Sequence, residues 1–152
     1  MTDQQLEEEL NVLVADDDSD DFEVLSEAIG SLPLRIVLTR AENGDVLMRL
    51  IHEKIPDLLI LDIILPCRDG RDCIREIRSD KKFDSLPIII YTSLKDADTI
   101  EFCYRWGTNI YVHKPHSYTD IAEIVKKIFT VNWKKLRYYP ARDEYVINPQ
   151  RV

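Results

Sequence analysis

The sequence predicts an α/β protein whose parallel sheet is covered by helices on both faces. Segments with strand and helix patterns alternate about five times along the 152 residues, which is typical of parallel strands joined by right-handed crossovers. The strand-like runs are short and almost continuously apolar, as expected for strands buried on both faces. Polar residues stand directly after several of these runs. These three observations predict one domain with polar side chains gathered at one edge of its sheet.

The expected strands are bounded by turn residues and differ in how uniformly apolar they are. The second is β-branched and partly alternating, so we expect it nearer the edge of the sheet. The third is uniformly apolar before Asp62, so we expect it at the centre. The predicted strands are Asn11–Ala15, Leu34–Thr39, Asp57–Leu61, Pro87–Tyr91 and Asn109–Val112.

Apolar residues at helical spacing predict a helix after each strand. In the first helix, Ser19 is the expected N-cap and Gly30 the expected end. The second is expected to begin at Asn43 or Asp45, and the last is expected to reach about Trp133. The predicted helices are 19–30, a segment from 43 or 45 to before 56, 70–80, 96–106 and 118–133.

The chain is acidic, with a net charge of −8, and it contains no lysine or arginine from residue 1 to residue 31. Because an acidic surface repels nucleic acid, we do not expect nucleic-acid binding. No apolar run is long enough to span a membrane, and no secretory leader opens the chain. We therefore predict a cytoplasmic protein without membrane contact. Cys67, Cys73 and Cys103 lack metal-ligand spacing, which favours reduced thiols.

Asp62 follows the central strand and either belongs to a functional site or caps the next helix. Polar residues at other strand ends favour a site: Asp16 and Asp17 follow the first strand, Thr92 the fourth and Lys114 the fifth. The carboxyl ends of parallel strands share one edge of the sheet. Three carboxylates there would raise one another's pKa unless cations joined them. Lys114 supplies one charge, and Mg²⁺, which binds carboxylate and phosphate oxygens, is the expected second.

The side chains expected at this edge suit phosphoryl transfer. A hydroxyl and an ammonium group beside a metal can bind the equatorial oxygens of a phosphoryl group. The Asp62 carboxylate can attack phosphorus and form an acyl phosphate. The predicted chemistry is therefore acceptance of a phosphoryl group by an aspartate.

Four motifs at these strand ends together resemble the receiver domain of two-component response regulators. The resemblance covers about residues 11–130 and implies a flavodoxin-like (βα)5 doubly wound parallel sheet with strand order 2-1-3-4-5. It also implies a signalling domain that at most catalyses its own phosphorylation and dephosphorylation. The motifs are Val14–Asp18, Leu61–Pro66 with Asp69–Gly70, Tyr91–Ser93 and Tyr111–Pro115.

The resemblance implies a role for each matching residue. Asp62 would be the phosphoacceptor, with a phosphohistidine on a sensor histidine kinase or phosphotransfer protein as donor. Thr92 and Lys114 would contact the phosphoryl group, and Thr92 and Tyr111 would form a switch. A cis peptide before Pro115 would direct Lys114 into the site.

The resemblance also implies a Mg²⁺ site. Asp17 and Asp62 would bind the ion directly, Asp16 would hold its waters, and the backbone carbonyl of Ile64 would be a further ligand. Ile64 and Leu94 are apolar at positions that flank the hydrolytic water in the family. We therefore expect a long-lived acyl phosphate.

Other polar residues near the motifs have simpler explanations. Asp18, Asp20 and Asp21 are expected to be helix-start charges favoured by the helix dipole. The two histidines beside Lys114 are expected at the surface rather than in a pH sensor. Cys67 is expected to be a loop spacer rather than a redox sensor.

The expected organisation is an acidic lead (1–10), a receiver domain (11–130), and an extension of the last helix with an aromatic and basic tail (131–152). The tail is too short for a DNA-binding unit, so we expect a stand-alone receiver, similar to those paired with phytochrome-like or hybrid histidine kinases. Its aromatic residues either pack on the domain or on a second copy, or the tail is frayed. A homodimer through this tail or through segments 96–133 is one expectation. The tail aromatics are Trp133, Tyr138, Tyr139 and Tyr145.

Three other functions are weighed against phosphoacceptance. An aspartate-nucleophile phosphohydrolase uses similar groups but carries a second aspartate two residues after its nucleophile, where this chain has Ile64. A receiver-fold scaffold that is not phosphorylated would not need the full set of charged residues. A flavin-binding domain would need a phosphate-binding loop after the first strand, where Asp16–Asp18 would repel phosphate.

Overall fold

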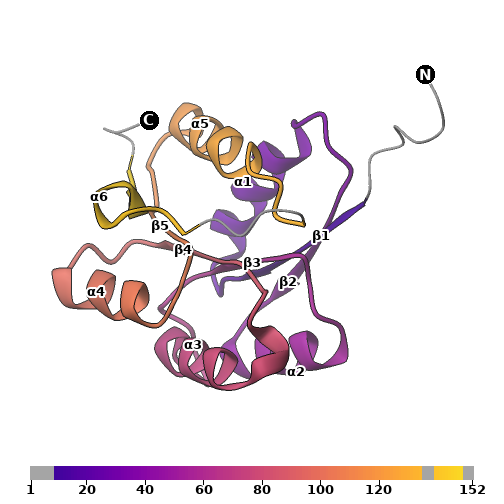
Figure 1. The fold of residues 1–152 in the computed structure, drawn as a ribbon. Helices are drawn as coiled ribbons and strands as arrows, with labels where there is room; N and C mark the ends of the chain where they lie inside the picture. Colours follow the sequence, from indigo (N-terminus) through magenta and orange to yellow (C-terminus); the bar gives the residue numbers. More distant parts are fainter. Residues whose placement is uncertain (1–8, 135–138, 149–152) are drawn as a thin grey trace.

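A sheet of six parallel strands forms the centre of the computed structural model, which describes residues 9–134 and 139–148. Their order is β2-β1-β3-β4-β5-β6 (Figure 1). The predicted flavodoxin-like order 2-1-3-4-5 is therefore confirmed, with one further strand at the edge. The strands are β1 Leu10–Ala15, β2 Ile36–Ala41, β3 Leu58–Leu61, β4 Ile88–Thr92, β5 Ile110–His113 and β6 Val146–Ile147.

Helices cover both faces of the sheet. α1 and α5 lie together on one face, and α2, α3 and α4 lie on the other (Figure 1). Within the described part of the chain, no helix is long and apolar enough to cross a membrane. The helices are α1 Ser19–Gly30, α2 Gly44–Glu53, α3 Gly70–Ser79, α4 Ala97–Arg105, α5 Tyr118–Phe129 and the short α6 Arg142–Tyr145, with a 3-10 turn at Lys81–Phe83.

The N-terminus of α1 is capped by Asp18, so the prediction that Ser19 caps it is wrong by one residue. The Asp18 carboxylate accepts hydrogen bonds from the amides of Asp20 at 2.9 Å and Asp21 at 3.0 Å. A carboxylate both satisfies free amides and interacts with the helix dipole, which favours it over the hydroxyl of Ser19.

Two further elements differ from their predicted bounds by two residues or more, while other ends shift by one residue. β2 runs over Ile36–Ala41, two residues later than Leu34–Thr39, because its whole length pairs in register with β1. α5 ends at Phe129 rather than near Trp133. Beyond that end, the indole N–H of Trp133 donates to the carbonyl of Ile128 at 3.0 Å, and this side chain is buried.

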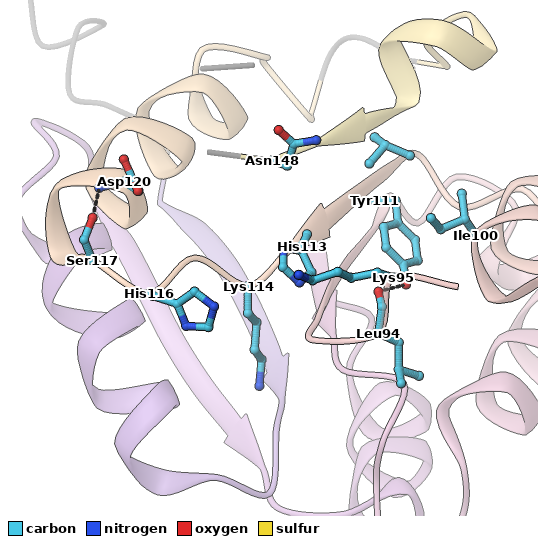
Figure 2. A pocket seen from close by; sticks show the side chains of 11 residues that line it. Leu94, Lys95, Ile100, Tyr111, His113, Lys114, His116, Ser117, Asp120 and Asn148 are labelled. Atoms are coloured by element: carbon cyan, nitrogen blue, oxygen red, sulfur yellow. Dashed lines mark hydrogen bonds between the residues drawn. The ribbon is translucent and has the colours of Figure 1, made fainter. Parts of the chain in front are cut away.

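The sixth strand comes from the tail and was not predicted. Val146 and Ile147 pair in parallel with Tyr111 and Val112 of β5. Asn148 follows β6 and lines the same pocket as Tyr111 (Figure 2). The described part of the tail therefore packs on its own domain, one of the alternatives expected for it, whereas Tyr138 lies outside the described residues.

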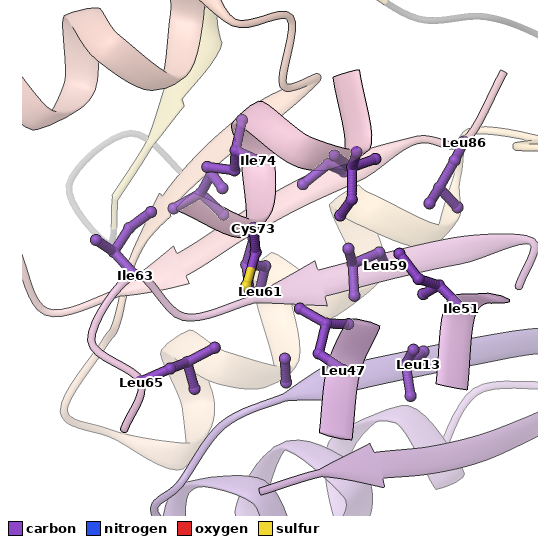
Figure 3. Close-up of a cluster of buried hydrophobic side chains, with 14 of the residues drawn as sticks. Leu13, Leu47, Ile51, Leu59, Leu61, Ile63, Leu65, Cys73, Ile74 and Leu86 are labelled. Atoms are coloured by element: carbon purple, nitrogen blue, oxygen red, sulfur yellow. The ribbon is translucent and has the colours of Figure 1, made fainter. Parts of the chain in front are cut away.

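The sheet separates two clusters of buried apolar side chains. Leu59 and Leu61 of β3 belong to the cluster under α2 and α3 (Figure 3), and Leu58 and Ile60 belong to the cluster under α1 and α5. This explains why β3 is uniformly apolar, since both of its faces are covered. Packing on both sides fixes the end of β3, where Asp62 begins the site.

Candidate functional site

Backbone hydrogen bonds bring four strand ends to one edge of the sheet. The amide of Asp62 donates to the carbonyl of Ala15 at 2.9 Å, and the amide of Lys114 donates to the carbonyl of Thr92 at 2.8 Å. Backbone hydrogen bonding between neighbouring strands thus continues to the residues directly after β3 and β5. These hydrogen bonds hold the backbone of Asp62 and Lys114 in place.

Three carboxylates form the centre of the site. Asp16, Asp17 and Asp62 each offer one oxygen, and these oxygens lie within 4.8 Å of one another. Asp16 and Asp62 are buried, whereas Asp17 is exposed. The cluster predicted from the strand ends is therefore present, with Asp17 on its solvent side.

Lys114 is the cation at the centre of this cluster. Its Nζ lies 2.8 Å from Asp62 Oδ2 and 2.9 Å from Asp16 Oδ2, and its side chain is only 12% exposed. Burial alone would lower the pKa of Lys114, but hydrogen bonds to the surrounding carboxylates raise it above its ordinary value. Lys114 is therefore a fixed positive charge at neutral pH.

The described peptide bonds contain no cis bond, so the prediction of a cis peptide before Pro115 is wrong. Lys114 is directed into the site by its backbone pairing with Thr92 and by its carboxylate partners.

Lys114 only partly compensates the negative charge of the buried Asp16 carboxylate. Burial raises its pKa above the ordinary value of 3.8, while Lys114 and the amide of Asp18, which donates to Asp16 Oδ1 at 3.0 Å, lower it in part. Desolvation is the larger effect, so the carboxylate is not fully compensated. A further cation beside it would remove that imbalance.

Arg40 holds the loop that carries the acid pair, a role that the sequence reasoning missed. Its guanidinium donates to the backbone carbonyl of Asp16 at 3.1 Å and to that of Asp17 at 3.0 Å. The same group lies over the ring of Phe22, 5.6 Å from its centroid. Arg40 directly follows the strand predicted over Leu34–Thr39, so its place at a strand end was a signal that could have found it.

The loop after β3 folds back closely on Asp62. The amide of Ile64 donates to Asp62 Oδ1 at 3.1 Å, while the Ile64 side chain is 50% exposed. A Cβ atom on Gly70 would lie 2.7 Å from the Asp62 carbonyl oxygen. Glycine is therefore required at Gly70 for α3 to begin this close to the site.

Thr92, the last residue of β4, is completely buried. Within the described residues its hydroxyl has no hydrogen-bond partner. A buried hydroxyl without a hydrogen-bond partner lowers the stability of the folded state and is uncommon in folded proteins. The Thr92 hydroxyl is thus available for a ligand or for a rearranged state of the site.

Tyr111 is buried beside the neighbouring β4–α4 loop. Its hydroxyl donates to the backbone carbonyl of Leu94 at 2.6 Å, and burial raises its pKa. Its ring lies 6.2 Å from the ring of Tyr145, which the tail brings to this face. The residue predicted to be a switch is therefore enclosed by the protein's own tail.

A pocket of about 490 Å³ opens beside this tyrosine (Figure 2). His113 and His116 are among its lining residues, with His113 half-buried and His116 exposed. Burial and the nearby Lys95 lower the pKa of His113.

Cys67 is exposed in the β3–α3 loop, with a φ of 68°.

Asp21 belongs to the site, although it was predicted to be a helix-start charge. Its Oδ2 lies 2.8 Å from Lys114 Nζ, the same distance as Asp62 Oδ2. The helix dipole alone accounts for an aspartate at this position. The sequence pattern therefore could not distinguish a helix-start charge from a partner of Lys114. The only available signal was its place one helical turn after Asp17.

The arrangement defines a class of protein. It is a flavodoxin-like α/β domain in which acidic side chains, a lysine and a buried hydroxyl stand at the carboxyl ends of the strands. Open α/β sheets bind ligands at this edge. The donor set, rich in carboxylate oxygen, suits a hard cation and a phosphate group.

Comparison with known proteins identifies the family. The family model for the response regulator receiver domain matches residues 12–126, and the chain belongs to this family. The probable C4-dicarboxylate response regulator DctR of Bacillus subtilis (strain 168) is 33% identical over 119 residues, which are 78% of this chain and 52% of DctR. The DNA-binding transcriptional regulator NtrC of Salmonella typhimurium is 32% identical over 116 residues, 76% of this chain and 24% of NtrC. The chain thus spans about half of DctR and about a quarter of NtrC.

Solved structures show the same fold. The phosphorylated cyanobacterial phytochrome response regulator RcpA has a TM-score of 0.78 and 23% identity, covering 88% of this chain and all of RcpA. The Mn²⁺-bound response regulator Rcp1 has a TM-score of 0.76 and 22% identity, covering 87% of this chain and 99% of Rcp1. The predicted resemblance to receiver domains of two-component signalling is confirmed.

Proposed function

We propose that Asp62 accepts a phosphoryl group from a phosphohistidine on a sensor histidine kinase or a phosphotransfer protein. The observation that carries this proposal is the Asp62–Lys114 ion pair at 2.8 Å, within a cluster that includes Asp16 and Asp17. A carboxylate oxygen can act as a nucleophile toward phosphorus. Lys114 lies where it can bind the incoming oxygens.

We propose Mg²⁺ as the cofactor, because the residues present fit it. Three carboxylate oxygens lie within 4.8 Å of one another, and burial leaves Asp16 incompletely compensated. Asp17 and Asp62 would bind the ion directly, Asp16 through water, and Ile64 through its backbone carbonyl. When bound, Mg²⁺ would neutralise charge on the phosphoryl oxygens and align the donor with the carboxylate.

The chain's own groups account for the remaining steps. A carboxylate oxygen of Asp62 forms a bond to phosphorus as the phosphorus–nitrogen bond of the donor breaks, and the bonding electron pair stays on the imidazole nitrogen. Lys114 Nζ binds a phosphoryl oxygen and offsets its charge. The product is an acyl phosphate on Asp62, which adds negative charge to the site.

The added charge would act through Thr92 and Tyr111. The Thr92 hydroxyl, buried without a partner among the described residues, would donate to a phosphoryl oxygen. Movement of Thr92 would change the packing of β4 against Tyr111 on β5, the neighbouring strand. The surface formed by α4, β5 and α5 would then differ between the two states, which is a local charge event acting on a two-state element.

This surface would transmit the signal through protein–protein contacts. We propose the histidine kinase or phosphotransfer protein as the upstream partner, and a homodimer through α4, β5 and α5 or through the tail as one form of output. The chain's net charge of −8 does not suit nucleic-acid binding.

The decisive experiment is the intact mass of the protein after incubation with acetyl phosphate and Mg²⁺. We expect a single phosphoryl adduct that forms on the wild type, requires Mg²⁺ and is absent from Asp62→Ala. Phosphoramidate and a phosphorylated histidine phosphotransfer protein serve as further donors. Failure with all three donors would overturn the proposal and favour a scaffold that is not phosphorylated.

A matched control separates the acceptor from its neighbours. Asp69→Ala removes a carboxylate that caps α3 and accepts from the amide of Arg71, outside the acidic cluster. We expect this variant to be phosphorylated like the wild type. Continuous release of inorganic phosphate from small phosphate esters would instead indicate a phosphohydrolase.

A further inference from the structure

We infer that Asp21 is a positioning residue that competes with the phosphoryl group for Lys114 and thereby disfavours strongly charged small-molecule donors. The inference rests on the proposed phosphoacceptor function of Asp62. It assigns a specificity role to a residue outside the acid pair and the phosphoacceptor.

The position of Asp21 follows from the start of α1. Asp18 caps the helix and accepts from the amide of Asp21 at 3.0 Å, which fixes Asp21 in the first turn. From there the carboxylate reaches Lys114 Nζ at 2.8 Å. The adjacent Asp20 also lies in the first turn, where its amide donates to the same cap at 2.9 Å.

Three carboxylates surround Lys114 in this arrangement. Its Nζ donates to Asp21 Oδ2 and Asp62 Oδ2, each at 2.8 Å, and forms an ion pair with Asp16 Oδ2 at 2.9 Å. An incoming phosphoryl oxygen must therefore compete with these carboxylates for Lys114. The transfer includes a competition between carboxylates and the phosphoryl group.

Asp21 is the carboxylate that Lys114 can release at the lowest cost. Its side chain is 45% exposed, compared with 2% for Asp16 and 7% for Asp62. Water can solvate Asp21 after release, whereas a buried carboxylate without its partner would keep an uncompensated charge.

The charge of Asp21 also predicts which donors it affects most. Its carboxylate repels an approaching anion and holds the cation that the anion needs. Acetyl phosphate carries more net negative charge at neutral pH than phosphoramidate, whose amino group is protonated. Asp21 should therefore slow transfer from acetyl phosphate more than transfer from phosphoramidate.

The test compares phosphorylation rates of the full chain with both donors in Mg²⁺, followed by intact mass. Asp21→Asn is expected to raise the rate constant for acetyl phosphate roughly three- to tenfold, and that for phosphoramidate by less than about twofold. Asp20→Asn removes the same charge one residue away and should change both rates by less than about twofold. Asp21→Glu should restore slow transfer from acetyl phosphate.

The outcomes separate this inference from the proposed function. Equal effects of Asp21→Asn and Asp20→Asn, or a slower Asp21→Asn, would overturn the role of Asp21 while Asp62-dependent phosphorylation stands. An equal increase with both donors would also overturn it, because donor charge would then not matter. Absence of any Asp62-dependent adduct in the wild type would overturn both.

Discussion

The unsatisfied hydroxyl of Thr92 gives a prediction at the scale of a single residue. Thr92 is completely buried, and its hydroxyl has no partner within the described residues. Thr92→Val removes that polar group while keeping the branched shape. We expect the unphosphorylated protein to gain about 1 kcal/mol in the free energy of unfolding, measured with urea.

Thr108 is the matched control for this substitution. It is also buried, but its hydroxyl donates to the carbonyl of Cys103 at 2.9 Å and contacts the hydroxyl of Tyr145. Thr108→Val should therefore destabilise the protein by about 1–3 kcal/mol, because it leaves buried polar groups unpaired. Destabilisation of both variants would show that Thr92 already has a partner in the unphosphorylated protein.

The residues that flank Asp62 give a second prediction at this scale. Ile64 is 50% exposed beside Asp62, the proposed phosphoacceptor. Leu94 packs against the core, and its carbonyl accepts a hydrogen bond from Tyr111. Neither side chain can position a water for hydrolysis. Ile64→Asn combined with Leu94→Glu is expected to speed loss of the phosphoryl group at least about fivefold, followed by intact mass over time. An unchanged lifetime would show that these side chains do not limit hydrolysis.

At the scale of elements, the predicted strands and helices were largely right because strong local signals mark them. β3 and β4 are apolar throughout, and side-chain caps such as Asn43 and Asp96 fix helix starts. β6 has only two residues, so it carries no periodic pattern. Its strand character comes from pairing with β5, which is a long-range contact. Elements that form because of local sequence signals can be predicted from the sequence. An element that forms only because it pairs with a distant strand cannot.

The tail gives a prediction at this scale, because Tyr145 joins it to the domain. Tyr145 is 1% exposed, and its ring packs edge-on against Tyr104 at 5.1 Å and lies near Tyr111. Tyr145→Ala should cost about 3–4 kcal/mol of unfolding free energy, and Tyr145→Phe about 1 kcal/mol. Tyr139, which is 54% exposed, is the control, and Tyr139→Ala should change stability by less than about 0.5 kcal/mol. A small effect of Tyr145→Ala would mean that the tail does not stabilise the domain.

At the scale of the whole molecule, topology explains which site residues could be predicted. Asp16, Asp62 and Lys114 directly follow strands and Thr92 ends one, so a parallel sheet must place them at one edge. Asp21 reaches that edge from α1, and the sequence pattern does not specify which way its side chain points. Arg40 could have been found by the same topological argument, since it directly follows the second predicted strand.

The acidic site also has a consequence for the stability of the whole domain. Burial raises the pKa of Asp16 above 3.8, so its carboxylate destabilises the folded state at neutral pH. This penalty disappears below about pH 3.8, where aspartate is protonated in both folded and unfolded states. In the absence of Mg²⁺, Asp16→Asn should therefore raise the free energy of unfolding by about 1 kcal/mol at pH 7. This difference between the variant and the wild type should shrink as the pH falls from 7 towards about 3.8.

If Mg²⁺ binds the folded site as proposed, it should make the wild type more stable than Asp16→Asn, the reverse of their order without the ion. At a Mg²⁺ concentration about 100 times the dissociation constant, the wild type should gain about 2.7 kcal/mol, measured by urea unfolding with and without the ion. Asp16→Asn and Asp17→Asn should gain less at that concentration, since each removes a donor to the ion or to its waters. The matched control is Asp72→Asn, an exposed change on α3 that should respond to Mg²⁺ like the wild type. If Mg²⁺ stabilises all four proteins equally, the ion does not bind at the carboxylate cluster. The buried Asp16 carboxylate would then lower the free energy of unfolding without a compensating ion.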